Sequence, residues 1–133
     1  MAQRSEEKLK GKRVLVVEDD PQVGEILKHL LTHYDHASQA SSGNEALKII
    51  EENPPDIMLL DLTLPDMSGL EVAQRVRRNR RTKSIRILAM SATPVDKRIW
   101  SKSGCNDFIL KPFSIPILLD RLSKLIRRSR KTS

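Results

Sequence analysis

The chain has 133 residues, a formal net charge of +7 and a single cysteine, Cys105. Its length predicts one domain with a real core and no second output domain, and no apolar run is long enough to span a membrane. The charged start of the chain is not signal-like, and one cysteine excludes an internal disulfide, which favours a cytoplasmic location.

Five short apolar runs alternate with five helical patterns along the chain. Such alternation predicts an α/β fold, a doubly wound five-stranded parallel sheet flanked by five helices. The predicted strands lie near Arg13–Val17, Tyr34–Gln39, Asp56–Leu60, Arg86–Met90 and Asp107–Leu110. The second of these is polar and is expected at an edge of the sheet.

The helices are predicted from caps, breaks and apolar spacing. The first begins at Pro21 with Asp20 as its cap. Its predicted buried stripe is Val23, Ile26, Leu27, Leu30 and Leu31. The next two follow Gly43 and Gly69, a short fourth runs from near Pro94 to Gly104, and the last starts near Ser114 and dissolves into a basic tail.

Acidic residues follow two of the predicted strands. Glu18 and Asp19 come directly after Val17, and Asp61 follows the apolar run that ends at Leu60. The carboxyl ends of parallel strands meet at one edge of a sheet, where open α/β sheets place their ligands. Three carboxylates at close range repel unless they are protonated or neutralised by a hard cation, so the pattern indicates a cation site, with an accidental acidic cluster as the alternative.

Two neighbouring acids are interpreted differently. Asp20 is expected to cap the first helix rather than to bind a ligand. Asp66 lies in a turn-forming Pro-Asp-Met-Ser-Gly stretch and is expected to be structural.

Five motifs in this order resemble the response-regulator receiver domain of two-component phosphorelays. They are VLVVEDDP at 14–21, GNEAL at 43–47, LLDLTLPDMSG at 59–69, MSA at 90–92 and FILKPF at 108–113. The resemblance covers roughly residues 12–128 and implies the strand order 2-1-3-4-5. It divides the chain into a basic N-terminal extension (1–12), a receiver domain (13–128) and a basic C-terminal tail (129–133).

The resemblance also implies the roles of the site residues. Asp61 would be the phosphoacceptor, attacking the phosphoryl group of a phosphohistidine. Glu18, Asp19, Asp61 and the backbone carbonyl of Thr63 would bind Mg²⁺ or Mn²⁺. Lys111 would pair with the phosphate, and the family often has a cis peptide bond at the position of Pro112.

A conformational switch and a lifetime control are implied in the same way. Ser91 would bond a phosphoryl oxygen and Phe108 would move inward in response; the alternative is a polar loop residue and a core aromatic. Thr63 and Thr93 match positions that modulate attack by water on the acyl phosphate. The interval from Ser91 to Lys111 is slightly shorter than usual for the family, which predicts a trimmed loop or helix there. Trp100, in this region, is expected either to pack inside or to anchor a partner.

The resemblance therefore implies a phosphoacceptor signalling domain rather than an enzyme acting on a separate substrate. Its phosphodonor would be a histidine kinase or histidine phosphotransfer protein, its output partner is an unknown protein, and the chain is either a single-domain protein or a receiver from a longer one. One alternative is a phosphatase or phosphotransferase with an aspartyl nucleophile, which would need a general acid where Thr63 stands.

A second alternative is nucleic-acid binding by basic residues. The candidates are the basic tail and an internal cluster of Arg75, Arg77, Arg78, Arg80, Arg81 and Lys83. Such clusters bind nucleic acid or acidic partners, or simply remain solvated. No aromatic residues interleave with these charges, which weakens a single-strand-binding interpretation.

Overall fold

The computed structural model describes residues 11–31, 34 and 36–131, in which strands and helices alternate. The elements are β1 (Arg13–Val17), α2 (Pro21–Leu30), β2 (His36–Ala40), α3 (Gly43–Glu52), β3 (Ile57–Asp61), α4 (Gly69–Arg78), β4 (Arg86–Ser91), α5 (Lys97–Lys102), β5 (Asp107–Leu110) and α6 (Ile115–Lys131). All strand pairs are parallel, in the order β2-β1-β3-β4-β5. This confirms the predicted fold class and strand order.

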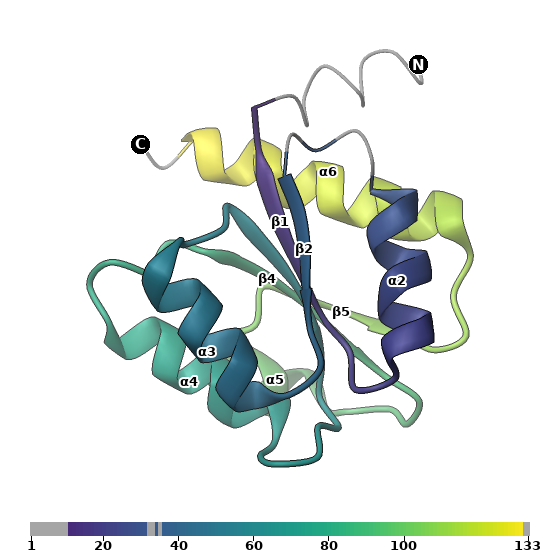
Figure 1. The fold of residues 1–133 in the computed structure, drawn as a ribbon, viewed down its shortest axis with the longest axis horizontal. Helices are drawn as coiled ribbons and strands as arrows, with labels where there is room; N and C mark the ends of the chain where they lie inside the picture. The colour runs from purple at the N-terminus through teal and green to yellow at the C-terminus, as the bar shows by residue number, and fades with distance from the viewer. Residues whose placement is uncertain (1–10, 32–33, 35, 132–133) are drawn as a thin grey trace.

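The helices cover both faces of the sheet. Figure 1 shows α3, α4 and α5 on one side and α2 and α6 on the other. Each side has its own aliphatic core, the first around Leu15, Met58 and Leu60, the second around Val16, Leu59 and Leu88. Neighbouring residues of the central strands thus enter opposite cores, which explains why these strands read as continuous apolar runs.

Side-chain caps fix where the helices begin. Asp20 Oδ1 accepts hydrogen bonds from the backbone N–H groups of Gln22 and Val23, as predicted. Ser42 caps α3, Ser68 caps α4 and Asp96 caps α5 in the same manner. Each cap satisfies N–H groups that have no partner within the helix, a contribution of about 1 kcal/mol. The caps of α2, α3 and α4 thereby fix the loops that follow the carboxyl ends of β1, β2 and β3.

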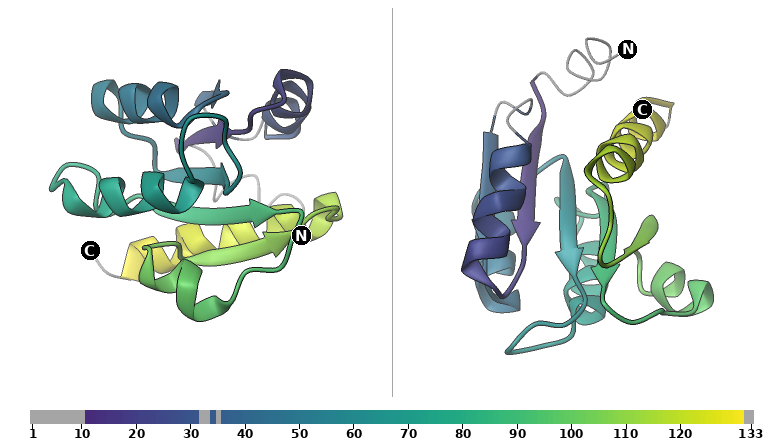
Figure 2. Two further views of the ribbon diagram at one scale, coloured as in Figure 1. Left: turned by 90° about the horizontal axis from the view of Figure 1, so that it is seen from below. Right: turned by 90° about the vertical axis from the view of Figure 1, so that its right-hand side faces the viewer.

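The loops after β1 and β3 meet at one edge of the sheet. In the right-hand view of Figure 2 both strands point downward, and both loops lie below the sheet. β1 and β3 are direct neighbours, with Val17 paired to Leu60, so the residues that follow them are brought side by side. This edge is where the sequence places its acidic residues.

Several predicted boundaries differ from the structure. β2 begins at His36, two residues later than predicted, and residue 35 lies outside the described residues. α5 begins at Lys97 because Asp96, rather than the Pro94 region, supplies the cap. α6 continues through Lys131 instead of dissolving after Ile126. Most of the predicted N-terminal extension, and residues 132–133 of the predicted tail, lie outside the described part of the chain.

The predicted buried stripe of α2 is partly wrong. Val23 and Ile26 are exposed, Ile26 by 60%. The helix instead contacts the sheet through a narrow strip formed by Gly24, Leu27 and, at its C-cap, Leu31. Gly24 allows this close approach, because a Cβ atom there would lie 3.1 Å from the Gln39 side chain. Because α2 contacts the sheet through this narrow strip, fewer of its side chains are buried than its apolar spacing predicts.

Candidate functional site

Three carboxylates converge at the carboxyl edge of the sheet. One oxygen from each of Glu18, Asp19 and Asp61 lies within 4.8 Å of the others. Glu18 and Asp61 are only 3% and 4% exposed, whereas Asp19 is open to solvent. The site, called the acidic pocket below, therefore combines two buried acids with one accessible acid, as expected from strands that lie side by side.

Lys111 connects two of these acids from the end of β5. Its Nζ atom lies 2.7 Å from Glu18 Oε1 and 3.0 Å from Asp61 Oδ2. The Lys111–Pro112 peptide bond is cis. Burial alone lowers the pKa of Lys111, but its hydrogen bonds to the two carboxylates outweigh burial and raise that pKa. The lysine is therefore a fixed positive charge in the pocket.

Burial acts in the opposite direction on Glu18. Desolvation raises the pKa of its carboxyl group, although the hydrogen bond from Lys111 pulls the pKa down again. Glu18 Oε2 also accepts a hydrogen bond from the Asp20 backbone N–H at 3.3 Å. Both Glu18 oxygens thus have donors in the structure, and the desolvation that remains favours a cation nearby.

The Asp61 carboxylate is held in one orientation. Its Oδ1 atom accepts a hydrogen bond from the Thr63 backbone N–H at 2.9 Å, while Oδ2 faces Lys111. Gly69 approaches Asp61 from the start of α4, and a Cβ atom at Gly69 would lie 2.7 Å from Leu62 Cα and closer still to the Asp61 carbonyl oxygen. Only glycine fits at this close approach, so the loop after β3 is packed directly against the acid.

The donor set fits a hard divalent cation. It consists of carboxylate oxygens with one solvent-exposed member, an arrangement that leaves room for metal-bound water. Among the described residues, no histidine or cysteine belongs to this cluster of acids. Oxygen-only ligands favour Mg²⁺, Mn²⁺ or Ca²⁺ over zinc or copper. The predicted acids are thus brought together in a pocket that could hold such an ion.

Ser91 and Thr93 lie beside this edge, at and beyond the end of β4. The Ser91 hydroxyl is buried, accepts a hydrogen bond from the Thr93 backbone N–H at 3.1 Å and lies 3.3 Å from Thr93 Oγ1. Met90, the residue before Ser91, pairs with Asp61 in the sheet. The Lys111 backbone N–H also donates to the Ser91 carbonyl at 2.8 Å. Ser91 is therefore placed between the strands that carry Asp61 and Lys111.

Phe108 lies on β5, three residues before Lys111. Its half-buried ring stacks on Trp100, with ring centroids 6.3 Å apart and an interplanar angle of 13°. Trp100 is buried, so it packs inside rather than standing free as an anchor. The stack joins β5 to α5, which is a connection that the sequence did not predict.

Asp66 is structural, as predicted, but it connects two segments that are distant in the sequence instead of stabilising only a local turn. Its two carboxylate oxygens accept hydrogen bonds from the backbone N–H groups of Gly43 and Asn44, each at 2.8 Å. These bonds lower the pKa of Asp66 and connect the loop after β3 to the start of α3. No pattern in the sequence pairs these two distant segments.

The internal basic cluster is not a uniform surface. Arg77 is half-buried, and its guanidinium donates hydrogen bonds to the carbonyl oxygens of Lys83, Ile85 and Gly104 and to Asn106 Oδ1. It holds the end of α4 against the segments that precede β4 and β5. The other five cations of the cluster are exposed. Arg77 is therefore a structural residue rather than a ligand-binding one.

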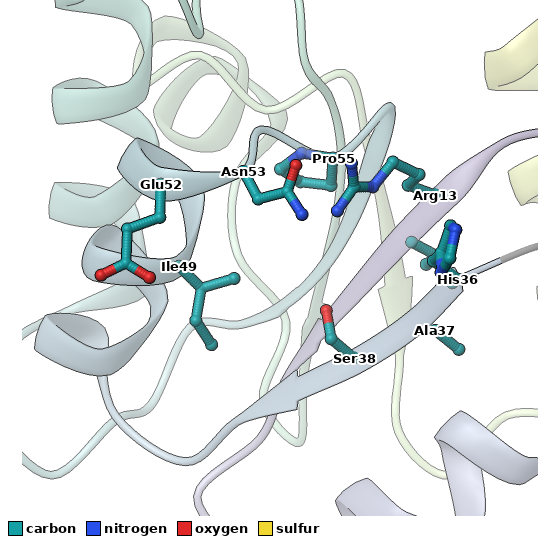
Figure 3. Close-up of a pocket in the computed structure, with 9 residues that line it drawn as sticks. Arg13, His36, Ala37, Ser38, Ile49, Glu52, Asn53 and Pro55 are labelled. Atoms are coloured by element: carbon teal, nitrogen blue, oxygen red, sulfur yellow. The ribbon is translucent and has the colours of Figure 1, made fainter.

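A separate cavity of about 480 Å³ lies at the other end of β1 and β2. Arg13, Ser38 and Asn53 point toward it from β1, β2 and the end of α3 (Figure 3). None of the predicted site residues lines it. The acidic pocket at the carboxyl edge is accordingly the candidate functional site.

The structure is thus a parallel α/β domain with three acids and a lysine at the carboxyl edge of its sheet. The family model "Response regulator receiver domain" matches residues 14–123. The chain belongs to this family, and it is a phosphoacceptor signalling domain of the two-component response regulators.

The relatives are longer proteins. The chain is 36% identical over 119 residues to the transcriptional regulatory protein TrcR of Mycobacterium tuberculosis, covering 88% of the chain and 46% of TrcR. It is 32% identical over 132 residues to a Vibrio cholerae protein named "Probable cyclic di-GMP phosphodiesterase", covering 98% of the chain and 30% of that protein. The chain thus spans less than half the length of either relative, and their activities are properties of those proteins.

Solved structures show the same fold. The chemotaxis protein CheY4 of Vibrio cholerae superimposes with a TM-score of 0.79 at 26% identity, covering 86% of this chain and 98% of that one. The receiver domain of the Francisella response regulator 1452 gives a TM-score of 0.78 at 28% identity, covering 90% and 99%. Within the described residues, no helix is long and apolar enough to cross a membrane.

Proposed function

We propose that the domain takes a phosphoryl group from a histidine kinase or a histidine phosphotransfer protein onto Asp61. The observation that supports this assignment is the position of the Asp61 carboxylate. It is buried beside two further acids, with Lys111 Nζ 3.0 Å from Oδ2 and the Thr63 N–H 2.9 Å from Oδ1. Both contacts orient the nucleophile before a donor arrives.

The transfer replaces one bond to phosphorus with another. A carboxylate oxygen of Asp61 attacks phosphorus, the P–N bond of the donor phosphohistidine breaks, and its electron pair stays on the imidazole nitrogen, which then takes up a proton. The product is an aspartyl phosphate. Negative charge spreads over the transferring oxygens, and Lys111 is the protein cation placed to stabilise it.

Glu18, Asp19, Asp61 and the Thr63 backbone carbonyl would hold Mg²⁺ or Mn²⁺ in this proposal. When bound, such an ion neutralises phosphoryl oxygens and orients them for in-line transfer. The protein contributes the oriented carboxylates, two of them buried, and the solvent-exposed Asp19. No described residue other than these acids forms a comparable cluster.

Ser91 and Phe108 would convert phosphorylation into a change of shape. The Ser91 hydroxyl now bonds to Thr93, and a new phosphoryl oxygen on Asp61 would compete for it. Movement of Ser91 frees space into which Phe108 turns, and the stacked Trp100 moves with it. Thr63 and Thr93 are short, uncharged and exposed, so neither would orient water for attack on the aspartyl phosphate as a carboxylate or amide could.

The two alternative functions have less support. An aspartyl phosphatase needs a general acid two residues beyond the nucleophile, where Thr63 cannot serve. Nucleic-acid binding loses Arg77, the central member of its cluster, to structural hydrogen bonds. We therefore infer that the only chemistry catalysed here is phosphorylation and dephosphorylation of the domain itself.

Phosphodonor labelling tests the acceptor. Acetyl phosphate with Mg²⁺ should add one phosphoryl group, seen by intact-protein mass spectrometry, and Asp61→Asn should abolish the addition. Asp66→Asn is the matched control, because it removes an exposed aspartate of the same segment that faces α3 instead of the pocket. Labelling that persists in Asp61→Asn would reject the site.

The fluorescence of Trp100 tests the switch. Trp100 is the chain's single tryptophan and stacks on Phe108. Addition of beryllofluoride and Mg²⁺ should change its emission in the wild-type protein. Lys111→Ala should retain Mg²⁺ binding but lose this response, whereas Lys48→Ala, on the exposed face of α3, should behave as wild type. A full response in Lys111→Ala would contradict the assigned role.

A further inference from the structure

The segment from α4 to α5 is strongly basic. Residues 69–104 contain ten Lys and Arg against two Asp and Glu, a net charge of +8, which exceeds the +7 of the whole chain. Both acids already have partners: Glu71 pairs with Arg75 and Asp96 with Arg98. The remaining cations have no local compensation from this segment, so the surface attracts an acidic ligand.

An apolar groove lies within this basic surface. Gln74 of α4 lines one wall, and Ile99, Lys102 and Ser103 line the other, around a volume of about 480 Å³. Ile99 is 52% exposed and lines the groove, so its side chain is available for an apolar contact. Lys102 and Arg98 flank it on α5, and Arg78 lies one turn beyond Gln74 on the same face of α4. We call this surface the α4–α5 groove.

The two walls are held at a fixed spacing. Arg77 of α4 donates from Nε to the carbonyl oxygen of Gly104, just beyond the end of α5, at 2.9 Å. On the inner side of α5, Trp100 rests on Phe108. The groove is therefore a preformed feature whose α5 wall is in contact with the proposed switch residue.

We infer that the α4–α5 groove docks an acidic amphipathic protein segment, which places an apolar side chain against Ile99 and carboxylates against Lys102 and Arg78. Helix-in-groove recognition uses this combination of apolar anchor and charged flanks. The apolar centre favours protein over nucleic acid. The chain's four aromatic side chains, Tyr34, Trp100, Phe108 and Phe113, are buried or half-buried, so no exposed ring offers a platform for bases.

A consequence for signalling rests on the proposed function. Movement of Phe108 after phosphorylation of Asp61 would displace Trp100 and with it the α5 wall, changing the affinity of the groove. The affinity for the docked segment would thus depend on phosphorylation of Asp61, a residue that the segment does not contact.

A peptide titration tests the docking. The probe is a fluorescein-labelled synthetic helix of about 16 residues, with leucines at helical spacing and glutamates between them. Wild-type protein should bind it saturably, and Ile99→Ala should weaken binding about tenfold. The matched control is Ile117→Ala, which removes an isoleucine of α6 that is equally exposed, at 50%, and should change affinity less than about twofold.

The charges are tested in the same assay. Lys102→Glu should weaken binding about tenfold, whereas the same change at Lys48 on α3 should have less than about a twofold effect. Equal losses at Ile99 and Ile117, absence of saturation, or tighter binding of a duplex DNA than of the peptide would overturn the proposal. Thermal unfolding of each variant confirms that it is folded.

Phosphorylation is measured separately. With acetyl phosphate and Mg²⁺, the peptide affinity of the wild-type protein should change at least about threefold, while that of Asp61→Asn should not. Phosphoryl labelling without a change of affinity would overturn the coupling. Absence of labelling would instead reject the proposed function, and the docking is then decided by the titration of the unmodified protein.

Discussion

Replacement of Arg77 by leucine should destabilise the domain by about 3 kcal/mol. The guanidinium donates four hydrogen bonds of 2.6–2.9 Å, to the carbonyl oxygens of Lys83, Ile85 and Gly104 and to Asn106 Oδ1. A hydrogen bond from a charged donor contributes about 1.5 kcal/mol, or about 6 kcal/mol for four. We halve this figure because the Lys83 contact is exposed and the side chain is only half-buried, so water replaces part of the loss.

Urea unfolding at neutral pH measures the effect as a change of midpoint at constant m-value. Arg78→Leu is the control, since it removes the neighbouring exposed arginine of the same helix. Arg77→Lys should give an intermediate loss, because an ammonium group cannot reach all four acceptors of a planar guanidinium. A loss below about 1 kcal/mol for Arg77→Leu, or one equal to that of Arg78→Leu, would show that the four contacts do not hold these segments together.

Three further perturbations have distinct outcomes. Gly69→Ala should lower the free energy of unfolding by about 2 kcal/mol or more and slow labelling of Asp61, because the new Cβ would meet backbone atoms. The control Gly24→Ala, whose Cβ meets only a movable side chain, should lower it by under about 1 kcal/mol. Equal unfolding midpoints for the two variants would contradict the close backbone contact at Gly69. Burial raises the pKa of the Cys105 thiol to about 11, so only about 0.1% is thiolate at pH 8. Iodoacetamide should therefore alkylate the folded protein about 100-fold more slowly than the urea-unfolded protein, at a rate that rises tenfold per pH unit up to that pKa. Similar alkylation rates for the folded and unfolded protein would refute the burial of the thiol. Because the pKa of Asp66 is lowered, its contribution to stability is present at neutral pH and is lost as pH falls through the acidic range. The difference in melting temperature between wild type and Asp66→Asn should therefore shrink from pH 7 to pH 3. A constant difference would show that the carboxylate charge is not involved.

The sequence predicted the central strands well because they are buried on both faces. The runs ending at Val17 and Leu60 are continuous and apolar, so neither their existence nor their carboxyl ends depended on distant contacts. Once these two strands are neighbours, the convergence of Glu18, Asp19 and Asp61 follows from parallel topology alone. The acids of the candidate site were therefore predictable from local patterns.

Features that depend on contacts between distant segments were not predictable. Arg77 looks like one cation among six in the sequence, and only the fold brings Gly104 and Asn106 within its reach. Ile26 has the spacing of a buried residue, but α2 approaches the sheet too closely along Gly24 for that side chain to be covered. Spacing identifies an apolar face, whereas the width of contact depends on the partner surface.

The charges of the pocket explain why Lys111 should have two positions in the proposed mechanism. At their formal charges, three carboxylates and one lysine leave about two negative charges, which one divalent cation neutralises. Phosphorylation replaces the single charge of Asp61 with about two, so Lys111 gains a stronger partner there than it has in Glu18. A lysine that leaves Glu18 for the phosphoryl group pulls on the end of β5, where its own N–H is bonded to the Ser91 carbonyl. The side chain that stabilises the product is thus joined through the backbone to both proposed switch residues, Ser91 at the end of β4 and Phe108 on its own strand.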